Sequence, residues 1–419
     1  MRDHGPITRA DVARTTHLSP VTVSATVRLL IQQGFVREAG PTLTPAGKRA
    51  TLLEFVGDVF YVVAVVADGS SLTAACFDLS GHRLSGVHRR GVDTPAAVER
   101  ELPPAVDEAL AGRARDRLLA VGVAVTGTVD PQRGVVQESG LFGIRRWPLG
   151  ARVSQALGGV AVVVENDVNA LLVGDRYVRA HRDRANILAV CLTQGVGGAI
   201  LVRGSIYHGH DHVAGELGAL STQGRDGSTC TLEQAVGERF LLERLRRSDP
   251  SFAAADPGAL ERLGEAPLSP AARAVVDDAA DRLVRSVVNA AVLLAPDEVV
   301  FAARPWGARL FGEPMRRALA SELSHPVPLR ILDDPVAAEL AGAAALAMSV
   351  TPLTDPLSAS PQPGQSGAPG ADLGRHARAV PLVPTGTASS GAGAPWDRRT
   401  AGGGPSAAGT RERAASRPS

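Results

Sequence analysis

The stretch from residue 160 to residue 220 constrains the fold more than any other part of this chain. Its apolar run VAVVV leads into Asn166 and Asp167, and a second apolar run, ILAVCL, leads into the glycine-rich turn QGVGG. Short apolar runs that end in polar or glycine-rich turns are typical of buried strands. Ligands of α/β sheets bind where such strands end. An acidic residue follows in the segment AGELG, so the stretch predicts a binding site for a polar small molecule.

The segment over 51–350 contains alternating strand and helix patterns, twice over. This alternation predicts an α/β domain of two lobes around the ligand site. The chain has 419 residues, which is long enough for more than one domain. No internal repeat is visible from residue identities, and one of the expected helices spans 232–247.

The three cysteines, Cys76, Cys191 and Cys230, are far apart in the sequence. This spacing argues against a disulfide framework and indicates a reducing, cytoplasmic setting. No apolar stretch reaches the roughly 20 residues that a membrane-spanning helix needs. The formal net charge of +1 argues against general binding to nucleic acid or membrane. We therefore expect a cytoplasmic protein with no membrane contact.

Residues 1–50 have the pattern of a small DNA-binding domain. Thr8 and Ser19 suit the caps of two short helices, and a strand pattern follows Gly34. Two short helices and a strand predict a winged helix-turn-helix. Seven basic and three acidic side chains in this segment suit contact with phosphates. The side chains expected to contact double-stranded DNA are those of Ser19, Pro20, Thr22, Val23, Ser24, Thr26 and Arg28.

Alternatives remain open for this N-terminal segment. A helical hairpin that contacts another protein has the same pattern. A three-helix module also needs a helix before Thr8, where Gly5 and Pro6 stand, so either the true start lies upstream or the core of the module is partly exposed. The segment over 41–50 is rich in turn formers, and we expect a linker there rather than a wing tip.

Residues 351–419 are rich in Pro, Gly, Ser and Ala. Such a composition cannot bury enough apolar surface to offset the entropy of ordering. The sequence therefore predicts three segments: a DNA-binding domain over 1–50, a two-lobed domain over 51–350 and a disordered tail over 351–419.

Several motifs resemble, in order and spacing, those of the ROK family, which comprises repressors, uncharacterised reading frames and sugar kinases. They are ITRADVARTTHLSPVTVSATVRLLIQQGFV, VGVAVTGTVDPQRGVV, VVVENDVNALLVGD, TQGVGGAILVRGSIYHG, AGELG and TLEQAVG. The resemblance covers about residues 7–348. It implies a fold of the α/β class, with an N-terminal winged helix-turn-helix followed by a two-lobed actin-like, sugar-kinase-like (ribonuclease H-like) domain.

The resemblance implies that Asn166, Asp167, Glu216 and Glu233 bind the hydroxyl groups of a sugar. Carboxylate and amide oxygens suit this task because they accept hydrogen bonds from adjacent hydroxyls. Asp167 stands at the position of the kinases' general base, and without ATP it would only contact the ligand. The alternative is that Asn166 and Asp167 merely cap the helix that follows them.

This chain departs from the family at the nucleotide site. The resemblance implies that kinase members hold ATP and magnesium with an Asp at the position of Val66, and with a glycine pair at the position of Ala303 and Arg304. An apolar side chain cannot ligate a metal ion. We therefore expect no nucleotide cofactor.

The chain also departs from the family at its structural zinc site. The resemblance implies a His and three Cys as ligands, whereas here Ala219 stands at the His position and Cys230 is the one Cys kept. Zinc needs four ligands, so we expect no metal. The histidines of the preceding loop, His208, His210 and His212, with Asp211, offer a weaker alternative metal site.

Taken together, the resemblance implies a DNA-binding transcriptional regulator, a repressor rather than an enzyme. Its partners would be a DNA operator, a sugar effector and a second copy of the chain, as a dimer or a dimer of dimers. One alternative is an ATP-dependent sugar kinase with a DNA-binding head. Another is a constitutive DNA-binding regulator whose sugar pocket is vestigial.

Overall fold

The computed structural model describes residues 5–43, 47, 49–179, 184–252, 257–261, 263 and 268–350. The expected disordered tail over 351–419 lies outside these residues. Within the described part of the chain, no helix is long and apolar enough to cross a membrane.

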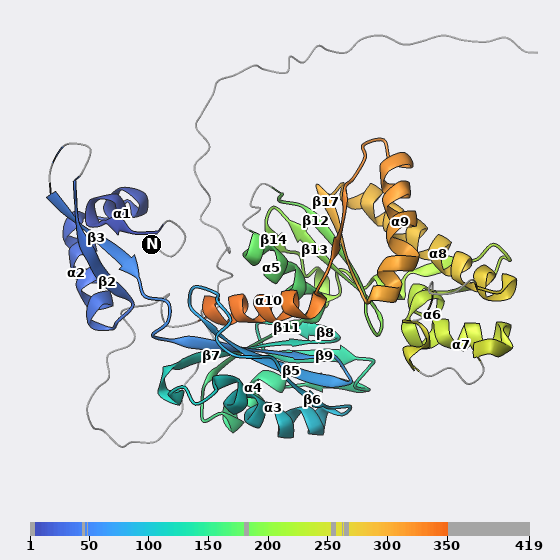
Figure 1. The fold of residues 1–419 in the computed structure, drawn as a ribbon, viewed down its shortest axis with the longest axis horizontal. Coiled ribbons are helices and arrows are strands. Elements are labelled where there is room, and N and C mark those ends of the chain that lie inside the picture. The colour runs from blue at the N-terminus through green and yellow to red at the C-terminus, as the bar shows by residue number, and fades with distance from the viewer. Residues whose placement is uncertain are drawn as a thin grey trace, which may run out of the picture. The chain divides into compact units, whose positions relative to one another are not determined.

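A five-stranded mixed sheet forms the first lobe (Figure 1). Its strands are β4 (Tyr61–Ala67), β5 (Ser71–Asp78), β6 (His88–Gly91), β7 (Leu118–Val125) and β11 (Ala161–Asn166), in the spatial order β11-β7-β4-β5-β6. The strands β11, β7 and β4 run parallel, while β5 and β6 are antiparallel additions. The central strands β4 and β5 are buried along their whole length, as expected for a sheet that helices cover on both faces.

The second lobe repeats the same sheet. Its strands are β12 (Ile187–Leu192), β13 (Val196–Val202), β14 (Ser205–Ile206), β17 (Glu298–Ala303) and β18 (Leu329–Leu332), in the order β14-β13-β12-β17-β18. In both lobes the first strand forms a hairpin with the second and a parallel pair with a later strand. This duplication was not visible from residue identities, because strand order depends on patterning rather than on particular side chains.

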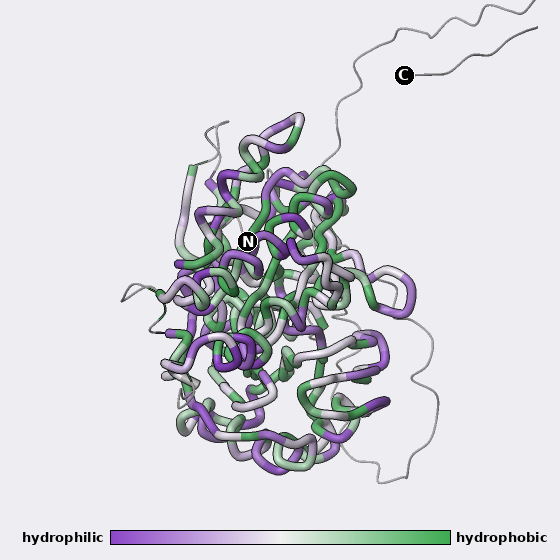
Figure 2. The backbone as a smooth tube through the Cα atoms, turned by 90° about the vertical axis from the view of Figure 1, so that its right-hand side faces the viewer, coloured by the Kyte–Doolittle hydropathy of each residue, from purple (hydrophilic) through white to green (hydrophobic). Residues whose placement is uncertain are grey.

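Two helices, α5 (Asp167–Arg179) and α10 (Pro335–Ser349), lie between the sheets and belong to the cores of both lobes. They can approach closely because Gly174 has no side chain. An added Cβ at this position would lie 1.9 Å from the Ala338 carbonyl oxygen. The other main helices are α3 (Pro95–Leu110) and α4 (Leu149–Ala156) in the first lobe, and α8 (Pro270–Leu294) and α9 (Pro305–Ser321) in the second. Figure 2 shows the inner strands as hydrophobic and many outer loops as hydrophilic.

The remaining strands form small sheets, and one helix expected from the sequence is divided into two. The short strands are β8 (Thr128–Asp130), β9 (Val135–Ser139), β10 (Ile144–Trp147), β15 (Ser221–Gln223) and β16 (Thr229–Thr231). The single helix expected over 232–247 is wrong. It forms two helices, α6 (Leu232–Val236) and α7 (Glu238–Ser248), because Gly237 between them has extended backbone angles.

The N-terminal elements are β1 (Ile7–Thr8), α1 (Arg9–Thr16), α2 (Pro20–Gln32), β2 (Val36–Leu43) and β3 (Arg49–Phe55). Thr8 and Ser19 cap the two helices as expected, each accepting a backbone hydrogen bond. The linker expected over 41–50 is wrong, because its described residues belong to the β2–β3 hairpin. The sequence suggested that this unit needs a further helix before Thr8. In the structure, β1 pairs with β3 at this place. Val23, Val27, Val36 and Leu53 form the core of this unit.

Candidate functional site

Strand register places the candidate site at one edge of the first sheet. Ala67, Val125 and Asn166 are hydrogen-bonded neighbours at the carboxyl ends of β4, β7 and β11. The residues that follow these strands therefore share that edge, and they include Asp68 and Asp167. Neighbouring strands lie about 4.8 Å apart, so two strand spacings separate these two backbones by about 10 Å.

Asn166 and Asp167 both cap α5 and face the strand ends. The Oδ1 atom of Asn166 accepts from the backbone N–H of Asn169 at 3.0 Å, and its Nδ2 donates to the Gly127 carbonyl at 2.9 Å. Asp167 Oδ1 accepts from the Val168 N–H at 2.9 Å and from Asn166 Nδ2 at 3.0 Å. Both bonds to Asp167 end on Oδ1, so Oδ2 has capacity for a ligand.

The second lobe supplies two more carboxylates. Glu216 Oε1 accepts from Thr128 Oγ1 of the first lobe at 3.2 Å. Glu233 lies in the first turn of α6, and its Oε2 accepts from the Val196 N–H at 2.6 Å. Thr231 and Gln234 form a capping box that fixes the start of that helix.

Three glycines bring these separate segments together. A Cβ added at Gly197 would lie 2.8 Å from Val168, and one at Gly198 would lie 2.7 Å from the carbonyl oxygen of Gly215. A Cβ at Gly195 would lie 3.2 Å from Glu233 Oε2. Val168 follows Asp167, Gly215 precedes Glu216, and Gly195 lies beside Glu233 itself. The glycine turn and β13 therefore contact the segments that hold three of the four residues expected to bind sugar. The glycine turn therefore serves close packing, a role that the sequence alone did not reveal.

Burial and mutual repulsion dominate the electrostatics of the site. Burial, with the negative charge of Glu216 adding to it, raises the pKa of Asp167 to about 6. Burial also raises the pKa of Glu216 and that of Glu233 above their usual values. A carboxyl group whose pKa lies near neutrality can exchange a proton or accept a hydroxyl hydrogen bond under ordinary conditions.

A supporting network that the sequence analysis missed holds the loop before Glu216. Glu165 is buried, and its carboxylate accepts from Asn169 Nδ2 at 3.0 Å and pairs with His208 Nε2 at 2.9 Å. This hydrogen bond raises the pKa of His208. The position of Glu165, next to Asn166 at the end of a strand, was the signal that could have identified it.

The alternative metal site in the histidine loop does not assemble in the described residues. His208 pairs with Glu165, His212 Nε2 lies 3.7 Å from Asp130, and His210 is exposed beside Asp211. No group of three His, Cys, Asp or Glu side chains within the described ranges could hold a metal ion.

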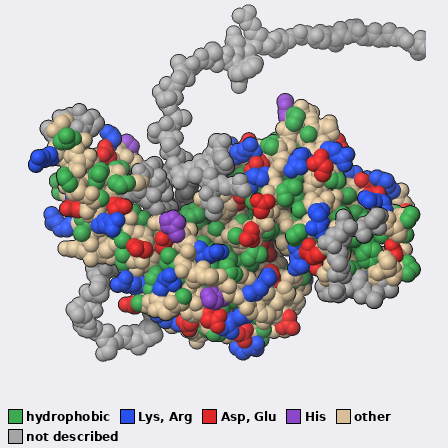
Figure 3. Space-filling model, in the orientation of Figure 1, with side chains coloured by type: hydrophobic (Ala, Val, Ile, Leu, Met, Phe, Trp, Pro, Cys, Tyr) green, Lys and Arg blue, Asp and Glu red, His purple; other side chains and the backbone are tan. Residues whose placement is uncertain are grey.

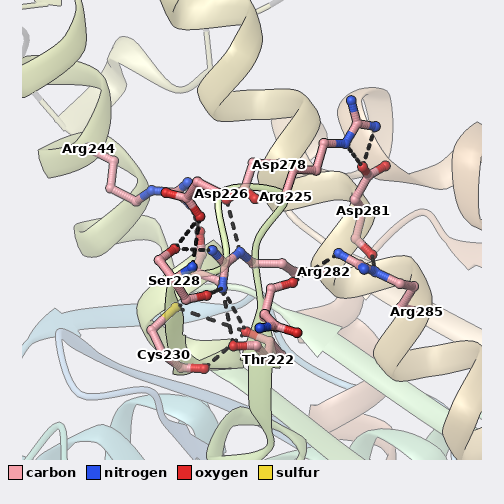
Figure 4. A network of polar contacts seen from close by, with 12 residues as sticks. Thr222, Arg225, Asp226, Ser228, Cys230, Arg244, Asp278, Asp281, Arg282 and Arg285 are labelled. Atoms are coloured by element: carbon pink, nitrogen blue, oxygen red, sulfur yellow. Dashed lines mark hydrogen bonds and ion pairs between the residues drawn. The ribbon is translucent and has the colours of Figure 1, made fainter. Parts of the chain in front are cut away.

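An arginine lies where the resemblance implies structural zinc. Arg282 of α8 inserts into the β15–β16 hairpin, as Figure 4 shows, and its Nη2 donates to Ser228 Oγ at 2.9 Å. Its Nη1 lies 3.3 Å from both the Thr222 carbonyl oxygen and Cys230 Sγ. Its Nε donates to Asp278 at 2.9 Å. These partners suit a guanidinium rather than zinc, since a fixed cation already lies among them.

The positions at which the resemblance implies nucleotide binding in kinase members carry other side chains in this chain. Val66 is 2% exposed within β4, and Ala303 is buried at the end of β17, where Arg304 stands at the N-cap position of α9. The turns that follow β4 and β12 meet directly, because Gln194 Nε2 donates to Ser70 Oγ at 2.6 Å. A groove of about 210 Å³ beside the start of α10 is separate from the site, and it is lined by Thr73, Arg83, Val87, Arg89, Asp334, Val336, Ala337 and Leu340.

The residues expected to contact DNA are not all on the outer face of α2. Ser19, Pro20, Thr22 and Arg28 are exposed, whereas Ser24 and Thr26 are half-buried. Val23 is 2% exposed and belongs to the core, which corrects the expectation that its side chain contacts DNA. The outer face of α2 consists instead of Val21, Ala25, Arg28 and Gln32, which follow helical periodicity.

Two lobes with the same sheet, and a glycine-rich hairpin beside a half-buried Asn-Asp pair, define an α/β protein of the sugar-kinase-like class. The chain belongs to the ROK family, whose model matches residues 62–349. Among curated relatives, the "DNA-binding transcriptional dual regulator NagC" of Escherichia coli K12 is 26% identical over 226 residues, which are 52% of this chain and 55% of that protein. A glucokinase of Streptomyces coelicolor is 31% identical over 158 residues, 38% of this chain and 49% of that enzyme.

Solved structures agree on the fold. A ROK family transcriptional regulator, described as a homologue of the E. coli MLC protein, superposes with a TM-score of 0.63 at 19% identity, covering 81% of this chain and 93% of that one. A ROK family glucokinase from Streptomyces griseus, solved with glucose and AMPPNP, superposes with a TM-score of 0.59 at 23% identity, covering 69% and 99%. The chain spans about half the length of the curated relatives that it matches first.

Proposed function

We propose that this protein is a DNA-binding transcriptional regulator of sugar metabolism, acting in the cytoplasm as a repressor. Its body binds a sugar or sugar derivative and has no kinase activity. The observation that carries the proposal is the combination, in one chain, of an N-terminal helix pair with a β-hairpin and a ROK body. The similarity to NagC supports it.

The proposed DNA-binding surface is the outer face of α2 with the β2–β3 hairpin as a wing. Arg28 is exposed and has no ion pair among the described residues, so its guanidinium is available to a base edge or a phosphate. Val21, 79% exposed, and Ala25 suit contact with thymine methyl groups. Figure 3 shows basic side chains on this unit with acidic ones interspersed among them.

The proposed sugar site consists of Asn166, Asp167, Glu216 and Glu233. Its carboxylates come from both lobes, so a bound sugar would favour one relative position of the lobes. A change in lobe position, passed to a dimer, would alter the spacing of the two DNA-binding units. The absence of kinase activity is supported by the burial of Val66 among aliphatic side chains of β4, where no magnesium ligand is offered.

A sugar kinase is the second candidate. The similarity to glucokinases favours it, as does the pKa of Asp167 at about 6, which suits a general base. Phosphate transfer from ATP to any hexose by the purified protein would establish this alternative and reject the non-enzymatic proposal.

The test of the regulator proposal is selection of bound fragments from sheared genomic DNA of the source organism, followed by titration of the selected site. We expect specific binding that Arg28→Ala weakens by about 1–3 kcal/mol while lowering the salt dependence. Arg316→Ala, on α9 and away from the proposed surface, is the matched control and should bind as the wild type does. Failure to enrich any fragment would reject DNA binding.

A further inference from the structure

One carboxylate near the site has no role in the proposed function. Glu339 of α10 is 6% exposed, and it forms no hydrogen bond or ion pair with any described residue. It is the one charged side chain within the helix sequence PVAAELAGAAALAMS. Burial, with the negative charges of Asp167 and Asp68 adding to it, raises the pKa of Glu339 well above its usual value. An ionised carboxylate without a partner is costly at such a position, so a cationic partner from outside the described chain would allow Glu339 to carry its charge.

Packing places Glu339 at the strand ends. A Cβ at Gly122 of β7 would lie 1.9 Å from the Ala343 carbonyl oxygen, so α10 crosses β7 at that point. Tyr177 Oη lies 3.9 Å from Met348 Sδ and 3.4 Å from the Ser80 carbonyl oxygen. Ser80 follows Asp78, which pairs with Tyr61 at the amino end of β4, so α10 runs toward that end. Glu339 lies one turn before Ala343 on the same helix face, which places it toward the carboxyl ends, beside the edge that carries Asp167.

Three carboxylates at this edge lack a positive partner. The negative charges of Asp167 and Asp68 act on Glu339, and Glu216 acts in the same way on Asp167. Asp68 has Arg89 at 3.6 Å and accepts hydrogen bonds from Ser70 and Ser71. No arginine or histidine among the described residues forms an ion pair with Asp167, Glu216 or Glu339.

We propose that the ligand of this site carries a positive charge: a sugar with a free, protonated amino group. Its ammonium lies between Asp167 and Glu339, and its hydroxyls are bound by Asn166, Glu216 and Glu233. This inference rests on the proposed function, since it names the chemical class of the same site's ligand. An ammonium donates three hydrogen bonds and satisfies carboxylates whose remaining acceptor atoms have no partner.

The spacing of the carboxylates favours an organic cation over a metal ion. No three of them, within the described ranges, converge closely enough to ligate one ion. The edge from Asp68 to Asp167 extends about 10 Å, a span that suits a hexose rather than a single divalent cation, whose oxygen ligands lie about 2.0–2.6 Å from it.

Isothermal titration of the full-length protein with glucosamine, N-acetylglucosamine and glucose tests the proposal. The first two sugars differ only in the acetyl group that removes the charge. We expect glucosamine to bind at least about ten-fold more tightly than either neutral sugar, a difference of about 1.4 kcal/mol. Equal or tighter binding of a neutral sugar would overturn the inference and leave the regulator proposal intact. Binding of magnesium or calcium chloride, with no sugar bound, would also overturn it.

The variant Glu339→Gln separates a ligand role from a structural one. We expect it to lose the preference for glucosamine while the free protein melts at a higher temperature, because a buried repulsive charge has been removed. Glu313→Gln, on the exposed face of α9, is the matched control and should keep the preference. A destabilised Glu339→Gln that still prefers glucosamine would assign Glu339 to the fold alone. If none of the three sugars binds while DNA binding persists, both this inference and sugar sensing fail.

Discussion

Asp167 combines three constraints in one side chain. It caps α5 through Oδ1, it belongs to the candidate site, and its ionisation is opposed by burial and by Glu216. The usual preference of a capping carboxylate for the charged form is therefore outweighed by desolvation at this position. The residue is held in place by hydrogen bonds while its charge is disfavoured, a combination typical of functional carboxylates.

Replacing Asp167 with Asn should change how stability depends on pH. The pKa of Asp167 in the folded protein, about 6, exceeds its ordinary value of 3.8, so folding favours the protonated form. That contribution is fully present below about pH 4 and is lost as the pH rises through about 6. Asn keeps the capping oxygen without the charge, so the variant should be more stable than the wild type by about 1–3 kcal/mol at pH 8, with no difference at pH 4. Urea unfolding across this range measures it, and a constant difference would contradict the assignment.

Gly198 shows how a residue without a side chain can position a site. An added Cβ would meet the carbonyl oxygen of Gly215 at 2.7 Å, and a backbone atom cannot turn aside as a flexible side chain can. We expect Gly198→Ala to cost about 1–3 kcal/mol in stability and to weaken sugar binding by displacing Glu216. Thermal unfolding and sugar titration measure both effects. Gly86→Ala, where nothing lies within 4 Å, is the control that should change neither.

At the scale of elements, the sequence predicted the strands and most helices because their apolar patterns and caps are local. The sequence-based prediction failed where contacts between residues far apart in the sequence, or the exact helix period, determine the structure. The segment over 232–247 has helical propensity throughout, but Gly237 breaks it beside the carboxylate of Glu233. The outer face of α2 was also misjudged, because alternate positions such as Ser24 and Thr26 do not lie on one face of a helix with 3.6 residues per turn.

The candidate site was predicted only in part for the same reason. Asn166 and Asp167 follow a strand, and local patterning reveals them. Glu339 and Arg282 belong to long helices far away in the sequence, and only the fold brings them to the strand ends and to the β15–β16 hairpin. A single acidic residue inside an alanine-rich helix was nevertheless a usable signal for Glu339, since acidic side chains are rarely fully buried unless they are paired.

The β15–β16 hairpin depends on Arg282 for its shape. Arg282→Ala would leave the Thr222 and Ser228 carbonyl oxygens, which now accept from the guanidinium, without that donor. We expect a loss of about 2–4 kcal/mol in the free energy of unfolding, and weaker sugar binding because the hairpin leads directly into α6 and Glu233. Chemical unfolding and sugar titration measure these effects. Arg285→Ala, exposed on the same helix, should cost far less, and equal losses from both variants would reject a special role for Arg282.

At the scale of the whole molecule, the repeated sheets meet through equivalent turns. The turn after β4 carries Ser70 and the turn after β12 carries Gln194, and one hydrogen bond of 2.6 Å joins them. Glu216 makes a second link between the lobes through Thr128. Contacts at exposed turns contribute little to overall stability, but they favour one relative position of the two lobes.

Gln194→Ala should therefore separate ligand affinity from stability. Loss of one hydrogen bond between exposed groups should change the melting temperature little, whereas the lobes would have to be drawn together by the ligand alone. We expect sugar affinity to fall by about 0.5–1.5 kcal/mol. Linkage requires that any change in the effect of sugar on DNA binding be equal to the change in the effect of DNA on sugar binding. Titration of sugar with and without operator DNA measures both quantities. Gln223→Ala, at an exposed position of the β15–β16 hairpin, controls for loss of an amide, and an unchanged sugar affinity in Gln194→Ala would show that the paired turns do not govern closure.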